Sequence, residues 1–157
     1  MRFNRIIKKT LTLFINQKKF IMAQTPVTLF VDGFKEREVQ AFSYSFNQAV
    51  DKENQPSGIP RGGQLKITVK AHNSGTPELM HWMLVQDMKK KGKLQIMQSN
   101  DVKTKMKDIE FEDAYCVDYK EEWLDDIKGG NIAHIETITL SCKMIKNQQV
   151  SFENEWK

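Results

Sequence analysis

The chain has 157 residues, of which 39% are apolar and 10% aromatic, and it carries 24 Lys and Arg against 20 Asp and Glu. This length suits one domain with a single core, and ordinary Gly and Pro contents with two cysteines exclude collagen-like, low-complexity and disulfide-scaffold classes. No uncharged run approaches the roughly 20 residues that cross a bilayer, so we expect a soluble globular protein. Its cysteines, Cys116 and Cys142, indicate a reducing compartment or inert buried thiols.

The excess of positive charge belongs to the N-terminal segment. Residues 1–22 contain six basic residues and no acidic one, which leaves a net charge of −2 for residues 23–157. We expect residues 1–22 to be a basic extension, either flexible or preceding a true start at Met22, because no small-residue cleavage site of a secretory signal follows. A segment lying on a membrane surface is the alternative. Residues 23–157 are predicted to form one domain with neither a nucleic-acid partner nor stable membrane insertion.

From residue 25 onward, apolar side chains recur at every second position, which is typical of strands that bury one face. Strands of this kind, closely spaced along a chain, predict an antiparallel sheet closed into a barrel or packed as a sandwich. The predicted inward positions are Val27, Leu29 and Val31; Phe42, Tyr44 and Phe46; Leu65, Ile67 and Val69; Ile109 and Phe111; and Ile138, Leu140, Cys142 and Met144.

One segment has the periodicity of a helix. Thr76 is a candidate N-cap and Pro77 suits the first helical position. We expect the helix to extend through the lysines of residues 89–91 and to end at Gly92. The side chains predicted to pack this helix on the sheet are Leu79, Trp82 and Met83. The predicted fold is therefore mainly β, with one α-helix beside the sheet.

The sequence contains no recognisable catalytic or metal-binding constellation. Its histidines, His72, His81 and His134, have no metal-ligand spacing with one another or with the cysteines. A nucleophile elbow, a phosphate loop and a dinucleotide fingerprint are also missing from the sequence. We therefore predict no enzyme activity, no cofactor and no metal.

Residues 50–63 form a connection between two predicted strands that is longer than an ordinary hairpin loop. Its prolines and glycines restrict the backbone at several points, so we expect a shaped projection that carries recognition. A disordered loop is the alternative. The residues assigned to this candidate site are Pro56, Ser57, Gly58, Pro60, Arg61, Gly62 and Gly63.

Charge is segregated along the second half of the chain. Residues 89–107 contain seven basic residues and one acidic one, whereas residues 108–126 contain nine acidic residues and one basic one. Oppositely charged blocks can bind copies of the chain head to tail. They can equally neutralise each other as neighbouring strands within one molecule. The sequence favours neither interpretation.

Several segments, in order along the chain, carry a family resemblance. They are FSYSFNQA (42–49), PSGIPRGG (56–63), ELMHWML (78–84), FEDAYCVDY (111–119) and ENEWK (153–157). Together they resemble the haemolysin-coregulated protein (Hcp, or TssD) family, the tube proteins of type VI secretion systems. The likeness covers roughly residues 23–157, and the basic extension departs from the family pattern.

The resemblance implies a small antiparallel β-barrel flanked by one helix, with six copies closing into a hexameric ring. It also implies that rings stack into a hollow tube, which a contractile sheath drives out of the cell and which can carry effectors. The implied partners are other copies of this chain, the sheath, spike and baseplate proteins, and effector proteins. The implied location is the bacterial cytoplasm before firing, followed by secretion without a cleaved signal. The long loop of the family, which matches residues 50–63, reaches the adjoining ring.

Two other classes follow from the residues alone. A small β-barrel could bind an apolar ligand as a carrier. An OB-like five-stranded barrel with the lysines of residues 89–107 could bind single-stranded nucleic acid. Against the second, the aromatic residues Phe42, Tyr44 and Phe46 lie outside the basic segment. The tube interpretation is preferred to both.

Overall fold

The computed structural model describes residues 26–71, 75–99, 103–126 and 131–156. The predicted basic extension, residues 1–22, lies outside the described residues, as does His72. In the described parts, no helix has the length and apolar character that crossing a membrane requires. The elements are β1 (Val27–Val31), β2 (Arg37–Tyr44), β3 (Gln64–Lys70), α2 (Glu78–Leu84), β4 (Lys90–Met97), β5 (Lys105–Asp126), β6 (Asn131–Asn147) and β7 (Val150–Glu153).

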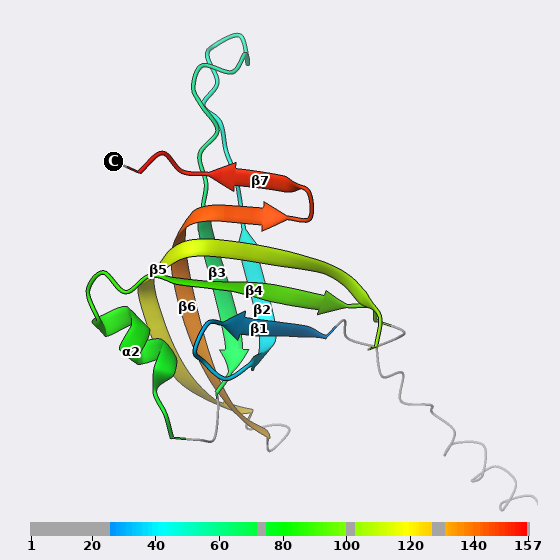
Figure 1. Cartoon of the computed structure of the whole chain (residues 1–157), viewed down its shortest axis with the longest axis vertical. Helices are drawn as coiled ribbons and strands as arrows, with labels where there is room; N and C mark the ends of the chain where they lie inside the picture. Colours follow the sequence, from blue (N-terminus) through cyan, green and yellow to red (C-terminus); the bar gives the residue numbers. More distant parts are fainter. Residues whose placement is uncertain (1–25, 72–74, 100–102, 127–130, 157) are drawn as a thin grey trace, which may run out of the picture.

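Six of these strands form a closed antiparallel barrel. Their order around the barrel is β3-β2-β1-β4-β5-β6, and β6 closes it by pairing with β3 from Ser141 opposite Gln64 to Ile135 opposite Lys70. Beyond this seam β6 pairs with β7, which lies across the upper end of the barrel (Figure 1). The predicted antiparallel β-barrel with one flanking helix is therefore confirmed.

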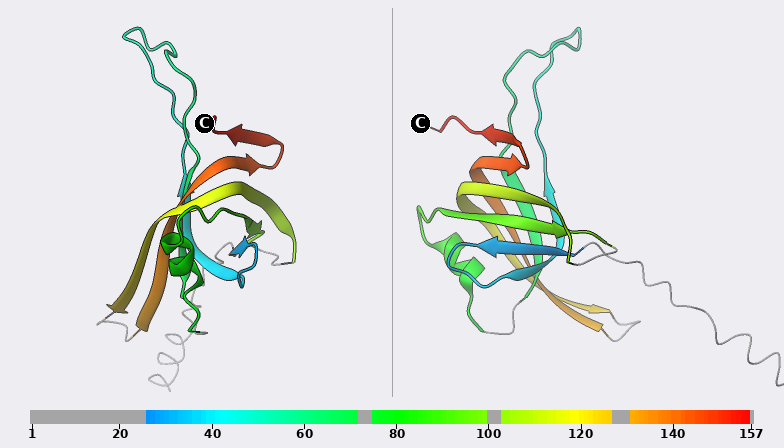
Figure 2. Two further views of the ribbon diagram at one scale, coloured as in Figure 1. Left: turned by 60° about the vertical axis from the view of Figure 1, so that its left-hand side comes forward. Right: turned by 45° about the vertical axis from the view of Figure 1, so that its right-hand side comes forward.

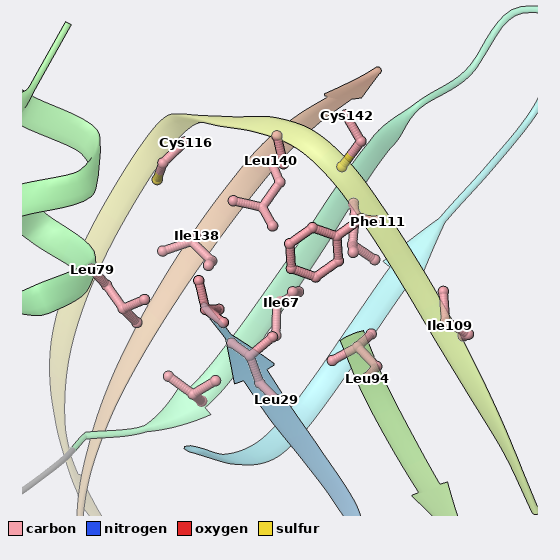
Figure 3. Packing of buried hydrophobic residues seen from close by; sticks show 14 of the residues in the cluster. Leu29, Ile67, Leu79, Leu94, Ile109, Phe111, Cys116, Ile138, Leu140 and Cys142 are labelled. Carbon is pink, nitrogen blue, oxygen red and sulfur yellow. The ribbon is translucent and has the colours of Figure 1, made fainter. Parts of the chain in front are cut away.

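The interior of the barrel is filled by apolar side chains (Figure 3). Leu29 on β1, Ile67 on β3 and Leu140 on β6 are 0% exposed, as the alternating pattern predicted. These side chains point toward one another from different walls and leave the barrel packed as a core. Such an interior argues against the alternative of an apolar-ligand carrier.

The inward alternation shifts by one residue where β5 bends. Phe111 is buried, and the next buried position is Ala114, after Asp113, whose φ is 47°. The pairing of β4 with β5 also shifts register at this point, as at a β-bulge. Because β6 stays paired with β5 through the bend, Ile145 becomes its buried residue, and Met144 is only partly buried. The predicted inward position of Met144 was wrong, as was that of Phe46, which lies beyond the end of β2 and is 43% exposed.

The helix α2 flanks the barrel and packs against β5 (Figure 2). Leu79 and Trp82 are each 1% exposed, and Met83 is partly buried against the same core. The Trp82 indole N–H donates to the Met88 carbonyl at 3.0 Å. Within the described residues, no side chain caps the helix, which begins after Pro77, so the predicted cap by Thr76 was wrong.

The helix ends at Leu84, much earlier than the lysine run had indicated. Lys90 and Lys91 instead begin β4, in which Gly92 lies between Val31 of β1 and Phe111 of β5. A Cβ atom on Gly92 would collide with the Phe30 carbonyl oxygen and lie 2.6 Å from the Phe111 ring. The predicted C-terminus of the helix was wrong because this glycine permits close packing between strands.

A buried ion pair, which the sequence did not indicate, joins β2 to β6. The Arg37 guanidinium donates to Glu136 at 2.9 Å and lies 4.0 Å from Glu78 at the start of α2. The Tyr119 hydroxyl donates to the second Glu136 oxygen at 3.0 Å. Burial and the neighbouring carboxylates of Glu136 and Glu121 raise the pKa of Tyr119. The network fixes the helix and three strands to one another.

Candidate functional site: the projecting arm

A long arm, residues 45–63, leaves the barrel between β2 and β3 and projects well beyond it (Figures 1 and 2). Every residue from Ser45 to Arg61 is exposed. All seven residues that we assigned to the candidate site lie on this arm, which begins earlier than the predicted residue 50. The structure places Pro56, Ser57 and Gly58 toward its end, and Pro60, Arg61, Gly62 and Gly63 on the strand that returns to the barrel.

Backbone hydrogen bonds hold the arm as a narrow, irregular hairpin. Asn47 and Arg61 exchange two of them, at 2.8 and 2.7 Å, and the Ser57 N–H donates to the Ala49 carbonyl at 2.9 Å. At the turn, the Asp51 carboxylate accepts the N–H groups of Glu53 and Gln55, both at 2.9 Å. The arm is therefore a shaped projection, as the Pro and Gly spacing predicted.

The two glycines at the base of the arm are required by close contacts. A Cβ on Gly62 would collide with the Phe46 ring. Gly63 has a φ of +93°, and a Cβ there would collide with the Asn154 amide and lie 2.8 Å from the Cys142 carbonyl oxygen. Asn154 donates to the carbonyls of Cys142 and Gly62 at 2.9 and 3.2 Å. The C-terminal segment thus clamps the base of the arm.

An apolar groove, which the sequence did not indicate, lies beside this base. Its volume is about 610 Å³. The Phe46 ring lies 4.9 Å from that of Phe152 and 5.9 Å from that of Tyr44. The residues that line the groove include Tyr44, Phe46, Pro60, Ile145, Val150 and Phe152. They come from β2, the arm, β6 and β7, so only the folded chain assembles them.

The oppositely charged segments lie partly on adjacent strands. Lys93 of β4 and Lys105 of β5 approach the Asp108 carboxylate at 3.6 and 2.9 Å. Neighbouring strands therefore neutralise part of the segregated charge within one molecule. The acidic residues at the far end of β5, which include Glu121 and Glu122, lie beyond these pairs.

Three lysines of the basic segment lie over aromatic rings. Lys90 lies 4.3 Å from the centre of the Phe34 ring, and Lys93 lies 5.6 Å from that of Phe30. Lys89 lies 5.4 Å from the centre of the Tyr115 ring. These cation–π contacts involve rings from other strands and loops, which spacing within the basic segment could not reveal.

Both cysteines are buried and free. Burial raises the pKa of Cys142 to about 12. It also raises that of Cys116 to about 11, against the opposing effect of a hydrogen bond with the backbone of Asp118. Neither thiol has the lowered pKa of a nucleophile.

The interior of the barrel is packed with side chains, and the most prominent surface feature is the exposed arm. These properties define a small β-barrel protein whose candidate contact site is on its outside. Comparison with known families matches residues 10–157 to the family described as Hemolysin coregulated protein Hcp (TssD). The chain belongs to this family, whose members are secreted, structural tube proteins of type VI secretion systems. The match begins within the segment that we expected to lie outside the family pattern.

Solved structures of the family have the same fold. Hcp1 from Flavobacterium johnsoniae is 29% identical, with a TM-score of 0.72 over 82% of this chain and 99% of that one. Hcp1 from E. coli EAEC 042, carrying two substitutions, is 14% identical, with a TM-score of 0.63 over 85% and 100% of the two chains. Hcp1 from Salmonella typhimurium is 16% identical, with a TM-score of 0.61 over 82% and 92%. No curated protein matches the chain.

Proposed function

We propose that six copies of this chain close into a ring through their barrel walls, and that the arms stack rings into a hollow tube. In this proposal the tube lies inside a contractile sheath and leaves the cell with a spike, carrying effectors in its lumen. Its components meet in the cytoplasm before firing. The observation that carries the proposal is the arm, which is ordered although it is exposed along its length.

The chemistry of the arm favours contact with a second ring. Its apolar side chains Val50 and Ile59 are 59% and 67% exposed, although burying them would stabilise the subunit. Arg61 is also exposed, and its guanidinium can form a forked pair with a carboxylate. Ordered loops that expose such groups on a rigid scaffold are typical of recognition. We therefore assign stacking to the arm and ring closure to the barrel.

Reversing the charge of Arg61 tests this assignment. Arg61→Glu should leave single rings intact and weaken tube assembly and secretion, because it replaces an attractive contact by a repulsive one. Light scattering measures the ring, expected at about six times the chain mass, and negative-stain electron microscopy measures the tubes. Lys35→Glu, an equal charge change at an exposed site outside the arm, is the matched control. Unaltered tube formation by Arg61→Glu would contradict the role of the arm, and loss of rings would place Arg61 on the ring interface.

A further inference from the structure

The end of the molecule opposite the arm carries an exposed tryptophan. There β5 and β6 remain paired as a hairpin that extends past the barrel (Figures 1 and 2). Trp123 on this hairpin is 69% exposed and its neighbour Leu124 is 48% exposed. We call residues 121–124 the tip. Because successive residues of a strand point to opposite faces, Trp123 and Leu124 expose apolar surface on both faces of the hairpin near its end. Such exposed apolar surface on a projecting hairpin indicates a contact with another molecule.

Trp123 is held in place although it is exposed. Its indole stacks on the His134 ring, with centres 3.8 Å apart and planes 13° apart. His134 is in turn fixed by Glu121, whose Oε1 lies 2.5 Å from Nε2. An aromatic side chain that is already ordered loses little conformational entropy on binding, which is a property of residues that dominate interfaces.

The apolar groove at the base of the arm has the chemistry to receive this tip. It is lined by the rings of Tyr44, Phe46 and Phe152, and its volume of about 610 Å³ can admit an indole. Val150, on its edge, is 75% exposed. β7 and the base of the arm, which line the groove, lie at the opposite end of the molecule from the end of the β5–β6 hairpin (Figure 1). The tip of one copy therefore cannot reach the groove of the same copy.

Charge favours the same pairing. Glu121 lies two residues before Trp123, on the same face of the hairpin, and its side chain is 45% exposed. Arg61 follows Pro60, which lines the groove, and it lies in a second hollow that shares Pro60 and Phe152 with the groove. A tip seated in the groove through Trp123 would therefore bring the Glu121 carboxylate toward an exposed guanidinium.

We propose that the tip of one copy docks into the groove of a second copy in the next ring, with Trp123 in the groove and the Glu121 carboxylate, on the same face of the hairpin, facing Arg61. This inference rests on the proposed stacking of rings and names the surface that the base of the arm contacts. A patch and its pocket at opposite ends of one molecule form a head-to-tail contact that repeats without closing. Several such contacts between two rings act together.

Complementary variants test the contact. Trp123→Asp replaces the apolar side chain of the tip and leaves the groove intact. Val150→Asp places a charge at the edge of the groove and leaves the tip intact. Each variant alone should remain as single rings at concentrations where the parent stacks. An equal mixture should form pairs of rings and nothing longer, because only one of the two possible contacts is intact. Analytical ultracentrifugation and negative-stain images distinguish these species.

Leu84→Asp is the matched control, because Leu84 is also 69% exposed but lies at the end of α2; this variant should stack like the parent. Circular dichroism establishes that each variant folds, and Trp123→Ala replaces Trp123→Asp if the latter does not. The inference would be overturned if either single variant stacked or if the mixture did not pair. It would also be overturned if the parent never associated end to end at millimolar concentration. If the parent instead had the mass of a single chain, the proposed function would be contradicted. The docking contact would still be tested in that case, because the mixture of variants would form dimers of chains.

Discussion

The barrel and the arm fix their backbones by different means. In the barrel, side chains such as Ile67 and Leu140 are completely buried, and apolar burial is the main stabilising contribution to folding. In the arm, order comes from local hydrogen bonds, from prolines and from the clamp that Asn154 provides at the base. On the proposed function the barrel supplies stability and ring closure and the arm supplies ring stacking, so substitutions on the arm should affect stacking without lowering stability.

The largest difference in the free energy of unfolding is expected between a substitution in the core and one at an exposed position of the arm. Trp82→Ala should lower the free energy of unfolding by roughly 3–5 kcal/mol, because it leaves a cavity between α2 and β5. Ile59→Ala, at a side chain that is 67% exposed, should change it by less than about 0.5 kcal/mol. Chemical denaturation of both variants measures the difference. A Trp82→Ala variant as stable as the parent would break the comparison, as would a large loss for Ile59→Ala.

The junction between the two regions should show an intermediate effect. Gly63→Ala introduces a side chain at positive φ that collides with Asn154, and we expect a loss of roughly 2–4 kcal/mol. Gly58→Ala, on the arm, would place its Cβ 3.5 Å from that of Ala49, an ordinary contact, and is the matched control. Thermal unfolding measures both variants. Equal melting temperatures would show that the base of the arm adapts freely.

The features that the sequence predicted depend on local periodicity. Alternating strands such as the one around Ile67 were found because burial of one face repeats every two residues. The end of the helix was missed because Gly92, which looked like a C-cap, is needed between strands that are distant in sequence. Met144 was misplaced because the bend in β5 shifts the alternation of its partner strand.

The candidate site was only half predictable. The Pro and Gly spacing indicated a shaped arm, since those residues restrict the backbone locally. The groove was not indicated, because it joins Tyr44 to Phe152 across the fold. The order of Trp123 also depends on His134, from the opposite strand of the hairpin. Such contacts depend on the register between strands, which local patterns in a single sequence do not reveal.

The buried thiols provide a pH-dependent test of the barrel. The pKa of Cys142 is raised to about 12 from 9.0, so the thiol ionises more readily in the unfolded chain than in the folded one. The stability associated with the protonated thiol is therefore complete below pH 9 and is lost as pH rises toward 12, by about 1.4 kcal/mol per unit. Cys142→Ala should unfold with a weaker dependence on alkaline pH than the parent, as measured by denaturation between pH 8 and 11. If the stability of the variant and that of the parent fell equally with rising pH, the Cys142 thiol would ionise as readily in the folded chain as in the unfolded one.

The smallest expected effect on global stability lies at the turn of the arm. Asp51→Ala removes the carboxylate that accepts the N–H groups of Glu53 and Gln55, so the turn should open more often. Because the arm is exposed, this opening need not disturb the barrel, and the free energy of unfolding should change by less than about 0.5 kcal/mol. Amide hydrogen exchange should nevertheless become faster at Glu53 and Gln55 and remain unchanged in β3. Asp51→Asn, which keeps an acceptor oxygen, should exchange at nearly the parent rate. If Asp51→Ala also accelerated exchange in β3, the arm and the barrel would unfold as one unit, and the separation between assembly and stability would not hold.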